Sequence, residues 1–573
     1  MRFRACLISL FLLAALLFSA CGREGVEGAK KTYPYRWFYM SSSLNDDSQV
    51  EEIRQVVKTA SEHGLNGMLL SAGLDRISLQ GPDYFRRLEE VQNICREYKV
   101  EIIPSVFSIG YGSAVLSHNK NLAAGIPVLD ALFVASGGEV KLVADPPVSI
   151  ANGSFENYEG NRVSGYTYSG EPGQVISVDN KIFKEGKSSL RFENFDQYPR
   201  EAGRMSQEIT VKPYRCYSLS VWIKSEGMDP SMPFGSGNLQ VLAFGPDGRQ
   251  LHWININVPP SGDWFKAQLG FNSLSYDKVK ISISTGRGKS GKFWIDDLRV
   301  GEAGLLNVLR RPGTPVTVRG EKNGTVYEEG RDYAPISDPE LNFSFDHDGP
   351  PIRLLPDSRI TEGERLRVSW YHGISVHDGQ VSVCMSEPEI YDIYRTETRL
   401  IHEHLAPKKY FLPQDEIRAG GSCQACRERN LTMGQILGDC VTRQVDIIRE
   451  NDPQAEIFIW SDMLDPNHNA RVREGNYYYH VDGSFTESWN YVPKDLIIAC
   501  WGRRARIKTL SHFSGLGFRT LAAAYYDADN LEDISGWLEA LDNTPDAVGI
   551  MYTTWLEKYA LLAEFGDLVS RKK

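Results

Sequence analysis

The sequence predicts an α/β protein: an eight-stranded (β/α) barrel of the TIM type, interrupted after its third strand by a β-sandwich and a small all-β segment. Short apolar strands alternate with amphipathic helical stretches near the N-terminus, and the same alternation resumes near residue 387. Three strands before the interruption and five after it give eight. Eight such units in one domain are typical of a closed barrel.

The first part of the barrel is predicted over residues 35–149. Gly64 stands where a helix C-terminus favours glycine. An open nucleotide-binding sheet would need a glycine-rich turn after the first strand, and SSSLNDDS is not such a turn. The predicted strands are 36–43, 67–73 and 100–110, and the predicted helices are 49–64 and 83–98.

The second part of the barrel is predicted over residues 379–573. It begins with a helix over 387–405, whose apolar positions recur every three or four residues. The strands that follow are predicted at 409–413, 456–462, 496–502, 519–526 and 547–555.

Residues 150–302 carry short alternating strands between turn-rich loops, which predicts a β-sandwich. The opening NGSFE at 152, the stretch from Gln207 to Ser225 and the closing Trp294-Ile295-Asp296-Asp297 resemble carbohydrate-binding modules of families 4 and 9. Trp253 and Trp264 are candidates for stacking on sugar rings, with a core role as the alternative. Residues 303–378 predict the small all-β segment.

The N-terminus has the pattern of an export signal. Arg2 and Arg4 precede an apolar run that is too short to span a bilayer, and residues 17–21, LFSAC, resemble a bacterial lipobox. Residues 1–20 are then a lipoprotein signal peptide, Cys21 is the lipidated residue and 21–34 is a tether. The alternative is a simple secretory signal with an incidental cysteine. We expect a protein of the bacterial cell envelope, anchored to a membrane by lipid and facing the periplasm or the exterior.

Charge excludes one class of partner. The formal net charge is -11, and no basic block interrupts the sequence, so the phosphate backbone of a nucleic acid would be repelled. We therefore expect no nucleic-acid partner, and the sequence leaves the oligomeric state open.

Two adjacent carboxylates, Asp415 and Glu416, follow the predicted fourth strand. Pro413 cannot donate a ladder hydrogen bond, so the strand should end near it, and catalytic groups of such barrels lie at the C-terminal ends of strands. Two acids held together in a partly desolvated mouth raise one pKa toward neutrality, which gives a proton donor beside an anion. The alternative is a pair of solvated loop acids that start a helix.

Aromatic and acidic residues recur at the later strand ends. Aromatic faces stack on pyranose rings, and acids accept hydrogen bonds from sugar hydroxyls. This pattern predicts a sugar-binding wall, and its members are Trp460, Asp462, Trp501, Tyr525, Tyr526, Asp527, Trp555 and Glu557.

With these residues, 36–120 and 380–565 resemble glycoside hydrolase family 20, the β-N-acetylhexosaminidases. The resemblance implies that Glu416 is the general acid/base and that Asp415 orients the substrate acetamido group, which acts as nucleophile. It further implies that Trp460, Trp501 and Trp555 wall the sugar, and that Tyr525 or Tyr526 and Glu557 hold it. The function expected is an exported glycoside hydrolase with a glycan substrate.

The sequence also departs from this family. Phe411-Leu412-Pro413-Gln414 replaces its His-x-Gly-Gly, and Ser41-Ser42-Ser43 stands near the place of its first-strand arginine. These departures favour a glycosidase of this general architecture over a hexosaminidase in particular. One alternative is a retaining glycosidase with a separate nucleophile at Glu387, Asp462 or Glu557. Another is a non-catalytic lipoprotein that binds glycan in the same cleft.

No cofactor or metal is expected. Cys423-x-x-Cys426 is interpreted as a local disulfide, half of a metal site with Cys440, or two thiols, with the disulfide favoured. His402 and His404 lack the spacing that places two ligands on one helix face. The loop with Asp462, Asp465 and His468 is either a cation or sugar site or a capped loop.

We predict that Cys21→Ser releases the protein from membranes or blocks its processing, because the serine hydroxyl cannot replace the thiol that accepts the lipid. Fractionation of cells, with mass spectrometry of the mature chain, checks this. Unchanged membrane association of the variant contradicts lipidation at Cys21.

Overall fold

The structure is a computed structural model, which describes residues 33–229, 239–285, 290–471 and 480–570. The predicted signal peptide and the lipidation site at Cys21 lie outside the described residues. Within the described ranges, no helix combines the length and apolar character needed to cross a membrane.

Eight parallel strands form a nearly closed barrel, as predicted from the sequence. Neighbouring strands pair in the order β23, β25, β27, β28, β29, β1, β2, β3. The last gap is bridged where Ser105 pairs with Phe411 and the Val106 N–H donates to the Phe411 carbonyl at 2.9 Å. The strands are β1 (Tyr35–Ser41), β2 (Gly67–Ser71), β3 (Glu101–Pro104), β23 (Lys409–Leu412), β25 (Glu456–Trp460), β27 (Ile497–Cys500), β28 (Arg519–Tyr526) and β29 (Ala547–Thr553).

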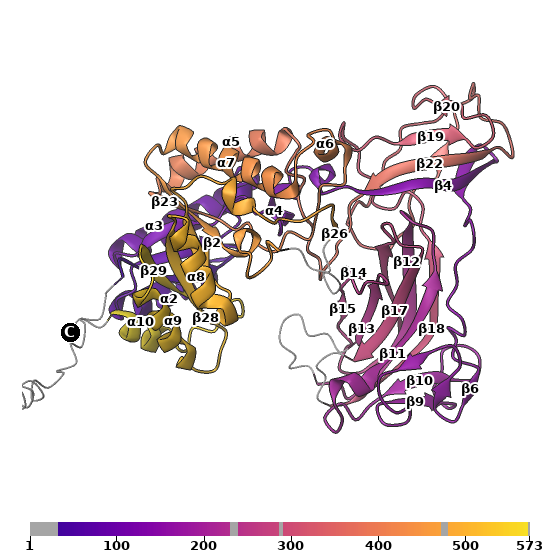
Figure 1. The fold of residues 1–573 in the computed structure, drawn as a ribbon, viewed down its shortest axis with the longest axis horizontal. Coiled ribbons are helices and arrows are strands. Elements are labelled where there is room, and N and C mark those ends of the chain that lie inside the picture. The colour runs from indigo at the N-terminus through magenta and orange to yellow at the C-terminus, as the bar shows by residue number, and fades with distance from the viewer. Residues whose placement is uncertain (1–32, 230–238, 286–289, 472–479, 571–573) are drawn as a thin grey trace, which may run out of the picture.

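Helices surround this barrel on the outside (Figure 1). Local sequence sets several of their ends: the Asp46 side chain caps the first turn of α2, Thr432 and Gln435 form a capping box on α7, and Gly64 adopts a positive φ of 81° just after α2. The helices are α2 (Asp47–Glu62), α3 (Pro82–Glu97), α4 (Ser113–Leu116), α5 (Glu389–Leu405), α6 (Gln424–Arg427), α7 (Met433–Asn451), α8 (Arg506–Gly515), α9 (Glu532–Asp542) and α10 (Leu562–Ser570).

The barrel interior is a separate packed core of large side chains. Side chains alternate along each strand, so one set faces the helices and the other faces the lumen. The lumen set includes Trp37, Phe411, Phe458 and Trp460, all buried. These rings fill the barrel, which leaves its C-terminal mouth as the place for a ligand.

The third strand is shorter than predicted. It ends at Pro104, whereas the apolar pattern continues to Gly110. Phe107 has a φ of 67°, a left-handed conformation that a strand cannot contain. The residues after β3 therefore turn across the barrel mouth.

The segment inserted between β3 and β23 contains a sandwich of two antiparallel sheets that share one apolar core (Figure 1). One sheet has the order β16, β12, β18, β10, β9, and the other has the order β14, β13, β17, β11, β8, with β15 paired to β13. Their strands are β8 (Thr167–Tyr168), β9 (Ile176–Asp179), β10 (Ser189–Phe192), β11 (Arg204–Thr210), β12 (Cys216–Glu226), β13 (Leu239–Phe244), β14 (Gln250–His252), β15 (Asn255–Ile256), β16 (Gly262–Asn272), β17 (Lys278–Thr285) and β18 (Lys292–Glu302). A short hairpin, β6 (Tyr158–Glu159) with β7 (Arg162–Val163), precedes them.

A further β-sheet, outside both the barrel and the sandwich, contains residues that were predicted to belong to the barrel. Residues 126–142, which the sequence analysis assigned to the barrel, form β4 and β5 of a six-stranded sheet with residues 317–372. The long strand β4 pairs with β22 along most of its length, so its neighbours are far away in sequence, and strand periodicity alone could not assign it. The strands are β4 (Ile126–Ser136), β5 (Glu139–Leu142), β19 (Thr317–Gly320), β20 (Val326–Tyr327), β21 (Ile352–Arg353) and β22 (Arg365–His372).

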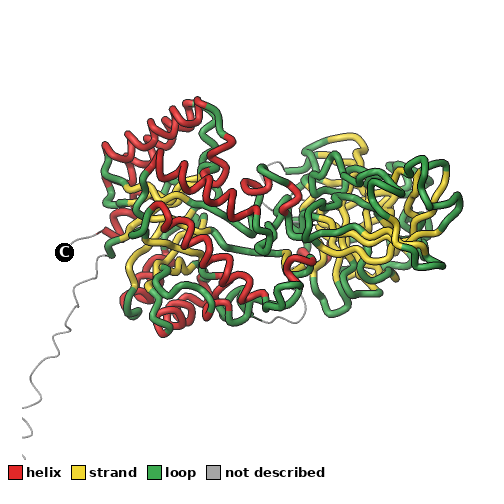
Figure 2. Tube along the Cα trace, turned by 90° about the horizontal axis from the view of Figure 1, so that it is seen from above, coloured by secondary structure: helices red, strands yellow, loops and turns green. Residues whose placement is uncertain are grey.

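The sandwich touches the barrel at the edge formed by β14 and β15. The helical half and the strand-only half of the molecule meet over a narrow region (Figure 2). The Arg249 guanidinium donates to the Val481 carbonyl at 3.0 Å, and the Asn255 N–H donates to the Asp378 carboxylate at 2.8 Å. Val481 belongs to β26 (His480–Val481), which pairs with β24 (Ala419–Gly420) a few residues after Glu416. One edge of the sandwich therefore lies close to the barrel mouth.

Candidate active site

The turn after β23 places Asp415 and Glu416 at the barrel mouth. Gln414 is fully buried, and its amide donates to the Phe107 carbonyl at 2.6 Å, which ties this turn to the residues after β3. Glu416 has a φ of 47°, so the chain leaves the extended form here, as the adjacent pair requires. The Glu416 N–H donates to Asp462 Oδ2 at 2.9 Å, which stabilises this left-handed residue.

Glu416 is held as an anion. Its Oε2 accepts hydrogen bonds from the Tyr111 hydroxyl and, at 2.8 Å, from Arg418 Nη2. Burial raises the pKa of Glu416, but the Arg418 guanidinium and the Tyr111 hydroxyl outweigh this effect, so the pKa lies below its ordinary value.

Asp415 has the opposite electrostatic environment. Burial comes first among the causes, followed by the nearby carboxyls of Asp462 and Glu416, and together they raise the pKa of Asp415 well above its ordinary value. The charge of Arg418, which is paired with Glu416, opposes this rise without cancelling it. The protonated form of Asp415 is therefore favoured beside a Glu416 whose ionised form is favoured, which is the arrangement of a proton donor next to an anion.

Asp462 lies beneath this pair, away from solvent. Its Oδ2 accepts from the Glu416 N–H and from the Asn469 amide at 2.9 Å, and Trp501 Nε1 donates to its Oδ1 at 3.4 Å. Burial raises the pKa of Asp462. Because its oxygens are engaged by protein groups, Asp462 positions Glu416 and Trp501.

The predicted aromatic residues line the same mouth in two layers. Trp460 is buried, with its ring 4.6 Å from Phe411 and 6.2 Å from Trp555. Trp501 stacks on Tyr526 at 6.3 Å between ring centroids, and Tyr526 meets Trp555 at 6.4 Å. Tyr526 is 56% exposed and Trp555 41% exposed, so apolar faces are available to a ligand beside the acids.

Three other predicted site residues differ in their placement. Tyr525 is buried among the helix-facing side chains, stacked on Tyr552 at 4.0 Å, so Tyr526 is the residue of this pair at the mouth. Asp527 accepts from the Thr554 hydroxyl at 2.6 Å and from the Trp555 N–H at 3.0 Å, and it shapes the loop that carries Trp555. Glu557 is exposed on that loop.

Two further acids named in the sequence analysis are structural. Glu387 is buried in an ion pair with Arg311 at 2.7 Å, at the contact between the barrel and the small β-sheet. Asp465 accepts from the Thr509 hydroxyl at 2.6 Å and caps the turn that contains Asn467. The second of the two interpretations of this loop, a capped loop, agrees with these hydrogen bonds.

Three residues of this site were not singled out by the sequence analysis. Tyr111 follows the third strand, Arg418 lies two residues after Glu416, and Gln380 precedes α5. Gln380 Nε2 donates to the Glu416 carbonyl at 2.9 Å, and the Gln380 amide oxygen accepts from Arg418 Nη1. Only the closeness of Arg418 to the acidic pair in sequence could have indicated a role, because Tyr111 and Gln380 reach Glu416 through the fold.

The sandwich contributes an aromatic side chain next to this network. The Trp253 ring lies 5.7 Å from the His377 ring, and the Trp253 N–H donates to the Val376 carbonyl at 2.9 Å. The Gln380 N–H donates to the His377 carbonyl at 2.8 Å, so the loop 376–380 connects Trp253 to the group that contacts Glu416. Burial and the Arg418 charge lower the pKa of His377 to about 4, which leaves its ring neutral at physiological pH.

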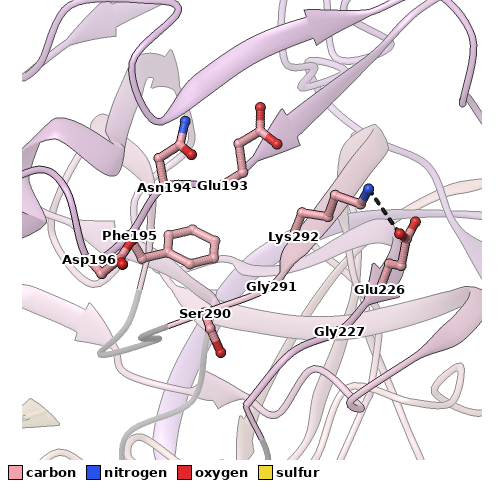
Figure 3. A pocket seen from close by; sticks show the side chains of 9 residues that line it. All are labelled: Glu193, Asn194, Phe195, Asp196, Glu226, Gly227, Ser290, Gly291 and Lys292. Atoms are coloured by element: carbon pink, nitrogen blue, oxygen red, sulfur yellow. Dashed lines mark ion pairs between the residues drawn. The ribbon is translucent and has the colours of Figure 1, made fainter.

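A separate cavity of about 390 Å³ lies on the sandwich (Figure 3). Its lining includes Phe195, Asn194 and the Lys292–Glu226 ion pair at 2.9 Å. None of its lining residues comes from the barrel. The carboxyl pair with opposite pKa shifts lies at the barrel mouth, so the chemistry is assigned there and not to this cavity.

Neither a family model nor a curated protein matches the chain. Among solved structures, it is similar to the chitobiase FjGH20 of Flavobacterium johnsoniae, with 7% sequence identity and a TM-score of 0.36, over 94% of this chain. It spans 48% of that chitobiase, about half its length. Part of the chain is similar to the module TmCBM61, solved with β-1,4-galactotriose, with 18% identity, a TM-score of 0.20, and coverage of 26% of this chain and 96% of that one. A CBM4 structure is similar with 15% identity and a TM-score of 0.21, over 27% of this chain and 99% of that one.

We predict that Asp415→Asn changes how stability depends on pH. Because the pKa of Asp415 is raised in the folded state, its contribution to the free energy of unfolding is complete below the ordinary aspartate value of about 4 and is lost as pH rises through the folded pKa. The melting temperature of the wild type should therefore fall relative to that of Asp415→Asn as pH rises above about 4. Glu557→Gln, which removes an exposed charge from the same mouth, is the control. A melting-temperature difference that stays constant with pH contradicts the raised pKa.

Proposed function

We propose that this protein is a glycoside hydrolase whose reaction centre is the Asp415–Glu416 pair. The observation that carries this proposal is the placement of two adjacent carboxyls at the C-terminal end of a barrel strand, where Arg418 pairs with Glu416 at 2.8 Å and the carboxyl of Asp462 lies beside both. Hydrolysis of a glycosidic bond needs a proton for the leaving oxygen and negative charge for the oxocarbenium-like transition state. A protonated Asp415 beside an ionised Glu416 can supply both.

The surroundings of the pair support a sugar as the ligand. Tyr526 and Trp555 expose aromatic faces at the mouth, and Trp460 and Trp501 lie beneath them. Flat apolar rings beside fixed polar groups suit the alternating apolar and hydroxylated surfaces of a pyranose. A protein that only bound glycan would have no use for a protonated carboxyl next to an ionised one, so catalysis is the favoured role.

The two carboxyls have two possible assignments, each with its own support. The resemblance to glycoside hydrolase family 20 implies that Glu416 is the acid and that Asp415 orients an acetamido group. The charges of the ligand-free molecule favour the reverse, because the Arg418–Glu416 ion pair at 2.8 Å stabilises the ionised form of Glu416. We propose the reverse assignment: Asp415 donates the proton, and Glu416 polarises the acetamido group that attacks the anomeric carbon.

A retaining mechanism with a separate carboxylate nucleophile is the second candidate. Of the three acids considered for that role, Glu387 is engaged by Arg311 and Asp462 by the Glu416 N–H. Glu557 is exposed on the loop that carries Trp555, so it is the acid that this alternative would use.

The location proposed for the enzyme is the bacterial cell envelope, with lipid on Cys21.

We predict that the two variants Asp415→Asn and Glu416→Gln fail in different ways. Loss of the proton donor should slow glycosides with poor leaving groups by about 10²–10⁴ and spare activated aryl glycosides. Loss of the anion that stabilises developing positive charge should slow both kinds of substrate. From the ion pair, we expect Asp415→Asn to spare activated substrates and Glu416→Gln not to do so. Steady-state rates with nitrophenyl and alkyl glycosides of N-acetylglucosamine measure this.

Three different results would each contradict one part of this proposed function. If Glu416→Gln is the variant that spares activated substrates, the assignment implied by the family resemblance is correct and ours is wrong. If hexosides without the acetamido group are cleaved equally well, or a sugar is trapped covalently on Glu557, a separate nucleophile acts. A folded wild type that binds glycan and cleaves no glycoside is a binding protein.

We predict that Trp253→Ala weakens the use of extended glycans more than that of small ones, because the Trp253 ring lies beyond the Glu416 network on the sandwich side. Loss of one stacking contact should raise the KM for an oligosaccharide about tenfold, or by ~1.4 kcal/mol, with little change for a nitrophenyl monosaccharide. Trp264→Ala, on the other sheet of the sandwich, is the matched control. An equal rise in the KM for the oligosaccharide in both variants would show that Trp253 does not contact the extended glycan at the mouth.

A further inference from the structure

Three buried cysteines converge at the base of the loop that carries the acidic pair. Cys384 Sγ lies 3.5 Å from Cys423 Sγ and 3.7 Å from Cys426 Sγ, and the three sulfurs lie within 4.8 Å of one another. The side chains are 2%, 1% and 4% exposed, respectively. The third thiol is Cys384. In the sequence analysis a local disulfide was favoured for Cys423-x-x-Cys426, and the metal-site alternative named Cys440 as the further ligand. Cys440 instead lies on α7 beside Tyr391.

We propose that Cys384, Cys423 and Cys426 bind a thiophilic d¹⁰ metal ion, of which Zn²⁺ is the natural candidate. Zinc bound tetrahedrally by thiolates at about 2.3 Å places neighbouring sulfurs about 3.8 Å apart. The 3.5 and 3.7 Å separations of Cys384 from its partners match that edge length. An iron–sulfur cluster needs its cysteines farther apart, since it holds several metal atoms. The sulfur spacing therefore fits one ion.

The backbone around the motif is already arranged for ligation. Cys423 is the N-cap residue of the short helix α6, and the Cys426 N–H donates to the Cys423 carbonyl at 3.2 Å. This turn brings both side chains of the Cys-x-x-Cys motif to one side, which is the geometry that short-spaced zinc ligands use. The Cys384 N–H donates to the Leu122 carbonyl at 2.8 Å, which fixes the third ligand from a separate segment.

A buried cation next to the thiols favours an anionic centre. Three thiolates and one divalent ion carry a net charge of about -1. The Arg311 guanidinium lies close enough to the Cys384 and Cys423 thiols to interact with them electrostatically. Arg311 Nη2 is buried without a hydrogen-bond partner in the structure, while Nε bonds Glu387 at 2.7 Å and Nη1 bonds the Ala123 carbonyl at 2.8 Å. The metal-bound sulfurs would accept the remaining Arg311 donor.

The role of the ion follows from the segments that it joins. Cys384 precedes α5, Cys423 and Cys426 lie in the loop between β23 and α7, and Arg311 comes from the region next to the small β-sheet. Adding a Cβ at Gly313 would bring it to 2.6 Å from the Ala425 Cβ, so the chain segments approach closely at this point. A bound ion would fix the far end of the loop that begins with Asp415 and Glu416. The site is structural and is independent of the reaction proposed above.

The test measures the metal content of the full-length protein. The protein is first reduced and incubated with Zn²⁺, and gel filtration then removes the unbound metal. We expect about one zinc ion per chain in the wild type and a lower melting temperature after chelation. Cys384→Ala should reduce the affinity for zinc by about 10–100-fold or more. Cys95→Ala is the matched control, because Cys95 is equally buried, at 2% exposure, and lies on α3 away from the cluster.

A second measurement does not depend on the folding of a variant. The wild type loaded with Co²⁺ should show the intense near-ultraviolet absorption of thiolate-to-cobalt charge transfer, and Zn²⁺ should abolish it. The proposal is overturned if the reduced wild type retains no zinc and shows no such band. It is also overturned if thiol titration of the unreduced, denatured chain finds two thiols fewer than the reduced chain, with the missing pair mapped to this cluster. That result would identify a disulfide in place of a metal site.

Discussion

The hydrogen bond from the Glu416 N–H to the buried Asp462 carboxylate is the interaction on which the geometry of the site depends. Two neighbouring residues in a strand point to opposite faces, so Asp415 and Glu416 share one mouth only because Glu416 takes a left-handed conformation. Asp462, at the end of the next barrel strand, stabilises that conformation at 2.9 Å. The same carboxylate accepts from Trp501, which joins the acidic pair to the aromatic residues.

The charges around this hydrogen bond give Asp415 and Glu416 different preferred protonation states. Asp462 adds negative charge near Asp415, while Arg418 and Tyr111 stabilise the ionised form of Glu416. Three neighbouring carboxyls with one guanidinium, in a site that is only partly open to solvent, cannot all be ionised without a cost in repulsion and desolvation. The protonated form is therefore favoured at Asp415, which has two acids beside it, and the ionised form at Glu416, which pairs with Arg418. The placement of Arg418 beside Glu416 therefore distinguishes the proposed proton donor from the proposed anion.

The excursion from the barrel is connected to the same network. The loop 376–380 contacts Trp253 on the sandwich and Glu416 in the barrel, and Cys384 follows it by four residues. The small β-sheet, the sandwich edge and the loop after β23 thus meet on one side of the barrel mouth (Figure 1). An insertion that returns its chain to the edge of the site can extend the surface available to a ligand without altering the barrel itself.

The sequence by itself determined the barrel strands, the interruption after the third strand, and the carboxyl pair with its aromatic neighbours. Local periodicity, proline and glycine positions, and the rule that strand ends carry the chemistry were sufficient for these, because each depends on residues close together in the chain. Tertiary structure alone decided which residues complete the site. Tyr111 and Gln380 reach Glu416 and Arg418 from two distant segments, and Tyr525 turns away from the mouth because of a register shift in β28. The pairing of β4 with β22 and the grouping of Cys384 with Cys423 and Cys426 likewise join residues that are distant in sequence. Contacts of this kind form only when the chain closes on itself, and no local pattern encodes them.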